Sequence, residues 1–306
     1  MSEKKVTQSH NLAYHRTVLI DEVLEYLNPQ PGKVYIDATF GGGGHTRAIL
    51  LKEPDCSVIA VDWDLQALEK NAPALQEEFG DRFYWIWGNF AQLPHLLKKN
   101  NIGAVDGVLV DFGTSQYQIT DREGFSFAAD TPLDMRMSTA HYKVTAADIV
   151  NNASEKELVV IFQDYGEERH ARKIARAICQ ARDMKKIRTT ADLSNIITSV
   201  VPFQRTHGKR GIHPATRVFQ ALRIVVNKEL DNIKTFLGHS PEILNKEGRV
   251  VCISFHSLED RIVKNYFRDH KEIFEILTPK IVVPTDEEVR VNPSSRSSRL
   301  RAARKI

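Results

Sequence analysis

Four glycines at residues 41–44 separate a short apolar run from a helical pattern in "YIDATFGGGGHTRAIL". Glycines at such a turn let a ligand approach the backbone closely. The helix that follows, beginning near His45 or Thr46, offers N–H groups and the positive end of its dipole to an anion. The pattern therefore predicts a nucleotide-like ligand here; the alternative is a glycine-rich surface turn without a ligand.

Residues after the next two apolar runs narrow the choice of ligand. Asp62 follows "VIAV" and can accept hydrogen bonds from both ribose hydroxyls, while Phe90 could pack against an adenine. The turn departs from G-x-G-x-x-G, because its sixth position is Thr46, and it lacks the Lys-Ser or Lys-Thr pair of a phosphate-binding loop. We therefore predict S-adenosylmethionine, with its carboxylate at the helix N-terminus, and keep NAD as the alternative.

Asp111 ends the fourth apolar run, in "VLVDFGTSQYQ". In an α/β sheet this position faces both the methyl group of such a cofactor and the acceptor. The lone pair of an exocyclic amine is delocalised into its ring. A carboxylate that accepts one N–H would orient the nitrogen and favour the charge developing on it. We predict Asp111 as the catalytic residue; the alternative is that it only caps the turn or binds the cofactor.

The first third of the chain alternates strand and helix patterns. Short apolar runs that end in Asp, Gly or Asn predict buried parallel strands at residues 34–40, 57–64, 83–89 and 107–113. Helical patterns lie between them, at about 45–53, 65–79 and 90–100. This alternation predicts an α/β fold, a parallel sheet with helices on both faces. Tyr84, Trp85 and Trp87 of the third run are expected in the core or near the adenine.

The alternation stops between about Thr120 and His213. Three patterns there predict helices, at 154–166, 167–183 and 189–201. After a helical stretch at 214–238, a strand pattern returns at 248–257, and the last ten residues could form a final edge strand.

We therefore predict a discontinuous Rossmann-like domain of residues 1–119 and 214–306, interrupted by a helical substrate-recognition insertion of residues 120–213. Two consecutive domains are the alternative. In "FHSLEDRIVK" we expect Ser257 to cap a helix together with Asp260, and His256 to shape the wall of the site.

The composition restricts the setting. The chain has 306 residues, a net charge of +3 and no apolar run of the ~20 residues that a membrane-spanning helix needs. Three scattered cysteines suit neither a disulfide framework nor a zinc site. The N-terminus resembles no secretory signal. We expect a cytoplasmic protein with no membrane partner and no metal.

Positive charge is concentrated in particular stretches. No Asp or Glu occurs between Leu193 and Lys228, and the glycine-punctuated segment "QRTHGKRGIHPATR" holds Arg205, Lys209, Arg210 and Arg217. We predict that these four side chains contact RNA phosphates, with a mobile linker as the alternative. Four more basic residues fall on one face of a predicted helix, where RNA contact and a solvated charged face both remain open: Arg169, Arg172, Lys173 and Arg176.

Motifs along nearly the whole chain point to one family. They include "YIDATFGGGGHT", "DFGTSQYQ", "YGEERHARKIARAI", "HPATRVFQALRI", "ISFHSLEDRIVKNYF" and "SSRLRAA", in this order. The chain resembles the bacterial small-subunit ribosomal RNA cytosine-N4 methyltransferases. The resemblance implies S-adenosylmethionine-dependent methylation of N4 of one cytidine in 16S rRNA, near the decoding site of the small ribosomal subunit.

The resemblance also implies which residues bind the cofactor: Gly43, Gly44, His45, Asp62, Phe90, Asp111 and Gln118. The loop after Asp111 departs from the family pattern, since Gln116 and Thr120 stand where a serine and an aspartate are common. This departure affects the expected placement of the cytosine beside Ser115. The oligomeric state stays open, a homodimer included.

Three rival functions remain to be weighed. A non-catalytic RNA-binding factor would be free to lose Asp111 and the cofactor residues, which this chain retains. A DNA cytosine-N4 methyltransferase usually carries a Pro-Pro-aromatic turn after the fourth strand, and "DFGTS" has no proline. A nicotinamide-dependent dehydrogenase is disfavoured by the missing sixth glycine. We therefore expect RNA, and not DNA, as the partner.

Overall fold

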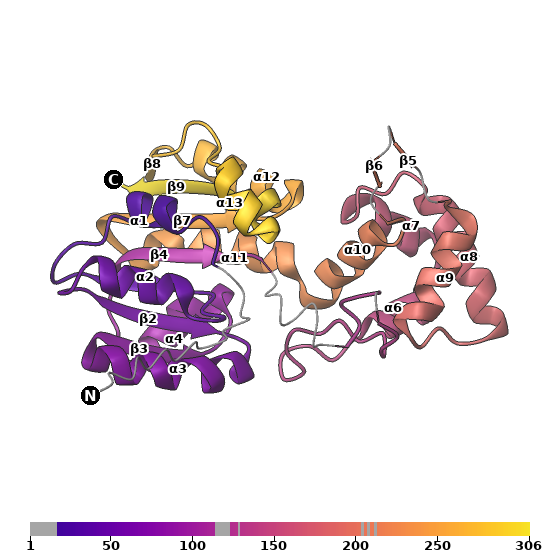
Figure 1. Ribbon diagram of the computed structural model, residues 1–306, viewed down its shortest axis with the longest axis horizontal. Helices are drawn as coiled ribbons and strands as arrows, with labels where there is room; N and C mark the ends of the chain where they lie inside the picture. Colours follow the sequence, from indigo (N-terminus) through magenta and orange to yellow (C-terminus); the bar gives the residue numbers. More distant parts are fainter. Residues whose placement is uncertain (1–16, 114–122, 128, 203–204, 207–208, 211–212) are drawn as a thin grey trace, which may run out of the picture.

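The computed structural model describes residues 17–113, 123–127, 129–202, 205–206, 209–210 and 213–306, which form an α/β lobe and a helical lobe (Figure 1). A sheet of seven strands runs through the described part of the α/β lobe, in the order β3-β2-β1-β4-β7-β9-β8. Its strands are β1 (Val34–Asp37), β2 (Ser57–Asp62), β3 (Phe83–Trp87), β4 (Val105–Asp111), β7 (Leu244–Ser254), β8 (Phe274–Ile276) and β9 (Arg299–Lys305).

The direction and order of the strands create a binding crevice. Strands β3, β2, β1, β4 and β7 are parallel, and β9 pairs antiparallel with β7 and β8. The chain moves outward from β1 to β3 and then restarts at β4, on the other side of β1. At such a reversal the connections leave in opposite directions and open a crevice beyond the carboxyl ends of the strands.

Helices cover both faces of the sheet and bury two apolar clusters. One cluster includes Leu27, Ile49 and Leu68, from α1 (Ile20–Leu27), α2 (Gly44–Lys52) and α3 (Leu65–Phe79). The cluster on the other face includes residues of α4 (Leu93–Lys99), α11 (Glu229–Ile243) and α12 (Ser257–Asp269). The predicted α/β class with a mostly parallel sheet is therefore confirmed.

The helical lobe has a third apolar cluster of its own. Its helices are α6 (Ala146–Asn152), α7 (Glu155–Asp164), α8 (Ala171–Met184), α9 (Thr190–Val200) and α10 (Thr216–Asn227). Capping boxes at Thr145, Ser154 and Thr189 start three of them. The predicted helices are thus present. Helix α8 buries Ala171, Ile174, Ala175 and Ile178 and exposes its basic face to solvent.

Several boundaries differ from the expectation. The helical stretch at 214–238 is broken at Lys228, whose φ of +50° ends α10 and begins α11. Helix α10 packs in the third cluster as far as Val226, so the apolar contacts of the helical lobe continue past residue 213. The last strand, β9, is not an edge strand, because β8 pairs along its outer side. A short hairpin, β5 (Arg205–Thr206) and β6 (Lys209–Arg210), lies within the predicted basic loop.

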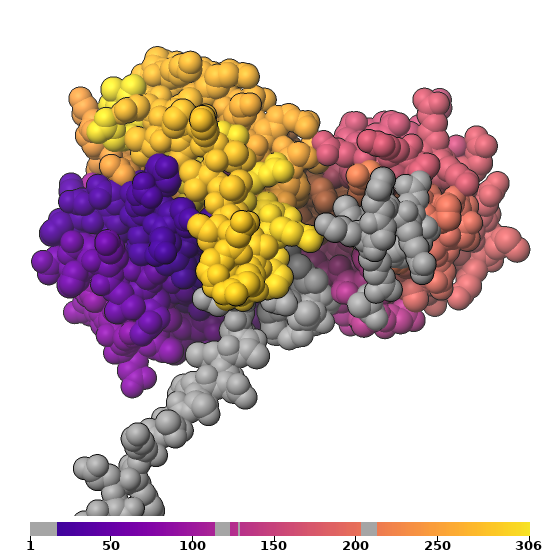
Figure 2. Space-filling model, turned by 45° about the horizontal axis from the view of Figure 1, so that its top comes forward, coloured from indigo at the N-terminus to yellow at the C-terminus, as the bar shows by residue number. Residues whose placement is uncertain are grey.

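Of the two places expected for Tyr84, Trp85 and Trp87, the core is wrong, and a position near the adenine stays a prediction. They are 50%, 36% and 43% exposed, because β3 is an edge strand and is buried only at Phe83 and Ile86. The C-terminal part of the chain (yellow) lies against its N-terminal part (indigo) in Figure 2. The carboxylate of Glu288, in α13 (Asp286–Val291), accepts the N–H of Leu19 at 2.8 Å across this contact. No helix in the described ranges is long and apolar enough to cross a membrane.

Candidate cofactor and acceptor site

A cavity of about 390 Å³ lies at the carboxyl ends of β1, β2 and β4. This is within the range of roughly 300–1,000 Å³ that is typical of small-molecule pockets. Its walls combine glycines, aromatic rings and carboxylates: Gly41, Gly42, Gly44, His45, Asp62, Trp63, Phe90, Asp111, Phe112, Met137, Glu229, Asn232 and Glu259, among others. The structure thus brings the predicted glycine turn, Asp62, Phe90 and Asp111 together around one cavity.

The structure gives a different explanation for glycine at each position of the turn. Gly43 has φ +76° and is buried behind the turn, where an added Cβ would lie 2.9 Å from the ring of Phe40. Gly44 begins α2, and a Cβ there would lie 1.8 Å from Oγ1 of Thr17. Gly42 borders the cavity, and a Cβ there would meet no protein atom within 4 Å. The turn therefore presents bare backbone and the first N–H groups of α2 to a ligand.

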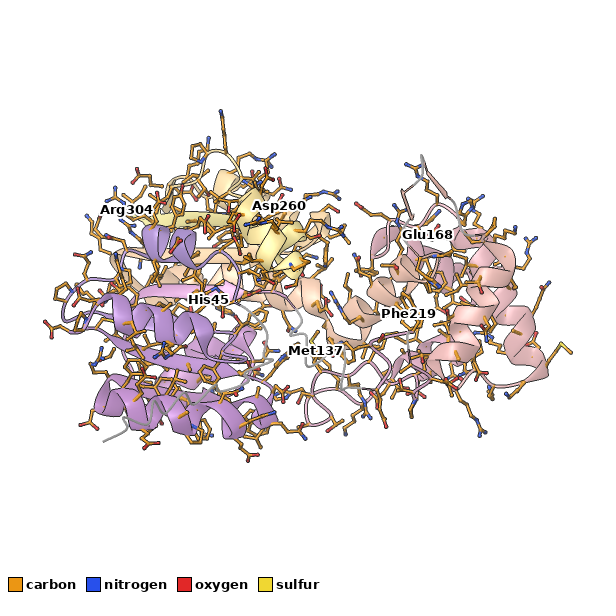
Figure 3. All side chains as sticks on the ribbon, in the orientation of Figure 1. His45, Met137, Glu168, Phe219, Asp260 and Arg304 are labelled. Carbon is orange, nitrogen blue, oxygen red and sulfur yellow. The ribbon has the colours of Figure 1, made fainter. Side chains whose placement is uncertain are left out.

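His45 joins this turn to the segment before α1. It is 6% exposed, and its Nε2 lies 2.9 Å from the carbonyl oxygen of Val18. His45 also borders the cavity, in the α/β lobe, as Figure 3 shows. Its imidazole fixes the segment of Thr17 and Val18 against the start of α2.

Asp62 ends β2 and is 7% exposed. Its two oxygens accept the backbone N–H groups of Gly41 and Asp64, each at 2.8 Å. Burial raises the pKa of Asp62 to about 7, although the two hydrogen bonds act to lower it. Burial also raises the pKa of Asp37, which accepts the hydroxyl of Thr46 at 2.7 Å behind the turn. A carboxylate has about four lone-pair sites, so Asp62 keeps two for ribose hydroxyls.

Aromatic rings form the wall beside Asp62. Phe90 lies between Trp63, Phe112 and Phe236, with ring centroids 6.4, 5.8 and 6.0 Å away. Trp63, Phe90 and Phe112 border the cavity. An adenine ring fits such a surface, because offset and tilted contacts between flat rings are favourable.

Asp111 ends β4 and borders the cavity. Its Oδ1 accepts the N–H of Gly113 at 2.8 Å, and its own N–H donates to Oγ1 of Thr39 at 2.7 Å. The turn-capping alternative is therefore real, and the same residue also borders the cavity. Gln118, the remaining predicted cofactor residue, lies outside the described residues, as do Ser115, Gln116 and Thr120.

Comparison with known proteins identifies the family. A model of the "MraW methylase family" matches residues 12–306. This chain belongs to the MraW methylase family. It is 46% identical to "Ribosomal RNA small subunit methyltransferase H" of Sulfurihydrogenibium sp., over 95% of this chain and 99% of the relative. It is 45% identical to the protein of the same name from Syntrophotalea carbinolica, over 95% and 98%. The resemblance that the motifs indicated is confirmed.

The MraW methylase cavity also contains residues away from the glycine turn. Met137 is held there by Asn227, whose Oδ1 accepts its N–H at 2.7 Å (Figure 3). Glu229 and Asn232 come from the first turn of α11, and Glu259 from α12. Glu229 and Asn232 were missed, because no motif in the sequence marks the start of α11 as part of a binding site.

The cap expected in "FHSLEDRIVK" is wrong. Glu259, not Asp260, closes the start of α12, since its Oε2 accepts the N–H groups of Phe255 and His256 at 2.7 and 3.3 Å. Ser257 instead donates to the carboxylate of Glu167 in the helical lobe, at 3.0 Å. In a capping box the carboxylate at the third helical position accepts the N–H of the N-cap residue, which here is His256.

The predicted RNA-binding residues lie on the helical lobe. Arg205, Lys209 and Arg210 belong to the β5–β6 hairpin, which projects from this lobe in Figure 1. Arg217 lies in the first turn of α10, and its Nη1 donates to the carbonyl oxygen of Glu167 at 3.3 Å. Arg217 does not border the cavity.

Proposed function

We propose that this protein uses S-adenosylmethionine to methylate N4 of one cytidine in 16S rRNA, near the decoding site of the small ribosomal subunit. One observation carries the proposal: the glycine turn, Asp62 and Asp111 surround one cavity in a chain whose relatives are named as small-subunit ribosomal RNA methyltransferases. The N4 position and the 16S target follow from the family that the motifs indicated.

The cavity residues suit each part of the cofactor. The carboxylate of its amino-acid tail would lie at the N-terminus of α2, next to Gly44 and His45. Its ribose would donate to Asp62, and its adenine would pack near Phe90. Gly43 supports the turn from behind. When bound, the cofactor supplies a methyl group on a positively charged sulfur, and the carboxylates of the cavity are suited to a cation.

Asp111 acts on the acceptor. Its carboxylate accepts one N–H of the cytosine amine and turns the nitrogen lone pair toward the methyl group. This contact strengthens as positive charge develops on the nitrogen, so it stabilises the transition state more than the bound substrate. Alignment of the amine with the methyl group supplies much of the remaining acceleration.

The substrate is a nucleotide outside a base-paired stack, because an amine inside a duplex cannot reach the cavity. The basic hairpin and Arg217 would contact the phosphates around it. Proteins that bind folded RNA recognise shape and unpaired bases, which favours an assembled or partly assembled small subunit as substrate. We therefore expect the protein to act in the cytoplasm.

The test uses purified protein, S-adenosylmethionine with a labelled methyl group, and small subunits from cells that lack the modification. We expect label in N4-methylcytidine at one position of 16S rRNA, located by digestion and mass spectrometry. Double-stranded DNA and large subunits serve as controls and should stay unlabelled. Label in another nucleoside, or binding of cofactor without transfer to any RNA, would overturn the proposal.

A further inference from the structure

Glu229 borders the cavity but has no part in the roles given above. It begins α11 and shares a helix face with Asn232 and Ile233, which border the cavity as well. Its side chain is 9% exposed. Burying a carboxylate costs solvation free energy unless hydrogen-bond donors surround it. We therefore expect Glu229 to accept hydrogen bonds both from the protein and from a molecule in the cavity.

Arg223 is the partner on the protein side. Its Nε and Nη2 donate to the two oxygens of Glu229, at 2.9 and 3.1 Å. The pair closes across the break between α10 and α11, where Lys228 has φ +50°. Two parallel hydrogen bonds fix the plane of the carboxylate, and each oxygen retains a second lone pair. Burial raises the pKa of Glu229, and the guanidinium of Arg223 opposes this shift.

Short contacts connect Glu229 to the end of the strand that carries Asp111. Phe255 packs so closely on Gly113 that a Cβ there would lie 2.5 Å from its ring. The N–H of Phe255 donates to Glu259 at 2.7 Å. The carboxylates of Glu259 and Glu229 have oxygens within 4.8 Å of each other. Glu229 and Asp111 therefore border the same cavity and are linked through Phe255 and Glu259.

A metal ion is the alternative occupant of this place. One oxygen each of Glu229 and Glu259 and a ring nitrogen of His256 lie within 4.8 Å of one another, close enough to hold an ion. However, the guanidinium of Arg223 already bonds both oxygens of Glu229. A divalent cation beside it would be repelled. The group thus suits a neutral N–H donor better than a metal.

The acceptor amine has a requirement that Asp111 alone does not meet. It carries two N–H groups, and both become stronger donors as the methyl group adds and positive charge develops on the nitrogen. Asp111 can accept one of them. A second acceptor would fix the rotation of the amine and stabilise the same charge.

We propose that Glu229 is this second acceptor, and that it orients the target amine together with Asp111. In the reaction, the N4 lone pair forms the C–N bond while the S–CH₃ bond breaks and leaves its electron pair on sulfur. One N4 proton passes to Asp111 and then to water. Glu229, paired with Arg223, keeps the other N–H in place. This inference rests on the proposed function and adds a catalytic residue to it.

The variant Glu229→Gln tests the inference, with methylation of unmodified small subunits as the assay. We expect kcat to fall about 100-fold, as for loss of one charged transition-state contact. The Kd of S-adenosylhomocysteine and the KM for subunits should change little. Wild-type kcat in a folded Glu229→Gln protein would overturn the inference. Because this change removes the charge that pairs with Arg223, the double variant Arg223→Gln/Glu229→Gln, which restores a neutral pair, should show the same loss of kcat.

Asp260→Asn is the matched control. Asp260 also pairs with a largely buried arginine, since Arg301 Nε lies 2.6 Å from its Oδ1, but it does not border the cavity (Figure 3). It should lower the melting temperature and leave kcat unchanged. A loss of kcat equal to that of Glu229→Gln would show that any broken pair of this type disturbs the site, and would overturn the inference.

A measurement on the wild-type protein keeps the inference testable even if the variants at Glu229 do not fold. Subunits that already carry N4-methylcytidine present an amine with one N–H, which cannot serve two acceptors. We expect a second methylation to be at least about 100-fold slower than the first; equal rates would overturn the inference. If the wild-type protein methylates no cytidine N4 at all, the proposed function fails instead, so the two failures are distinguishable.

Discussion

The carboxylate of Asp62 should make cofactor binding depend on pH. Burial raises its pKa to about 7 in the protein without ligand, and ribose hydroxyls donate best to the ionised form. Binding should therefore tighten as pH rises to 7 and level off above it, with a Kd about tenfold lower at pH 8 than at pH 6. Calorimetry with S-adenosylhomocysteine measures this. Asp62→Asn should bind S-adenosylhomocysteine weakly, with a Kd that no longer depends on pH. If the variant keeps the pH dependence, a group other than Asp62 is titrating.

Alanine substitutions at two neighbouring glycines should affect different properties, stability at Gly43 and cofactor binding at Gly42. Gly43→Ala meets both a left-handed φ of +76° and the ring of Phe40, so it should lower the free energy of unfolding by about 2 kcal/mol. Gly42→Ala meets no protein atom but points into open space beside the cavity. It should leave stability unchanged and weaken cofactor binding. Thermal melts with and without S-adenosylhomocysteine separate the two effects; equal melting temperatures would contradict this account of the turn.

At the residue scale, the sequence predicted the site residues that directly follow a strand pattern. It missed the site residues that reach the cavity only through long-range packing. The glycine turn, Asp62, Phe90 and Asp111 could be found because each follows an apolar strand, and parallel strands end at one edge. Glu229 could not be found in this way. It reaches the cavity because a non-glycine residue, Lys228, breaks a continuous helical pattern with a positive φ, and no local signal marks that break.

At the scale of elements, Asn227 holds the segment that carries Met137 to the cavity. It is fully buried, accepts the N–H of Met137, and donates to the carbonyl oxygens of Met135 and Arg223 at 2.8 and 2.9 Å. Asn227→Ala removes these three hydrogen bonds from a buried position and should cost about 2 kcal/mol or more. Hydrogen exchange should show faster exchange at Met137. Asn195→Ala, at an exposed position of α9, is the control; an equal response would contradict the assignment.

The edge of the sheet shows another limit of sequence patterns. An apolar, aromatic run predicts a strand equally well at the centre or at the edge, because the pattern reports local preference and not neighbours. Tyr84, Trp85 and Trp87 read as core residues for that reason, yet β3 is the first strand of the sheet. The strand β8 was missed because its three residues are too few to form a pattern.

At the scale of the whole molecule, the chemistry lies in the α/β lobe and the predicted RNA contacts in the helical lobe. Replacing Arg205, Lys209 and Arg210 with alanine should therefore weaken binding to small subunits and leave the Kd of S-adenosylhomocysteine unchanged. The slope of log Kd against log salt should fall by about two, as expected for three lost phosphate contacts. Alanine at three exposed lysines of the α/β lobe, Lys52, Lys98 and Lys99, removes the same charge. An equal loss there would indicate general electrostatic attraction.

The family could be read from the sequence because the motifs span nearly the whole chain. The two predicted parts rest on the change of pattern after the fourth strand. The boundary between the parts was harder to predict, since α10 shares the apolar cluster of the helical lobe although it follows the basic stretch. Amphipathic patterns show that a helix buries one face, but they do not show which neighbour covers it.

The central claim is that one cavity binds the cofactor and places Asp111 against the acceptor amine. Asp111→Asn keeps the size of the side chain and an oxygen for Gly113 but removes the charge. The direct measurement is its single-turnover rate on unmodified small subunits, together with its Kd for S-adenosylhomocysteine. We predict a rate at least about 100-fold below that of the wild-type protein, with a similar Kd. An unchanged rate would contradict the claim, and so would a rate that returns to the wild-type value once the cofactor is saturating.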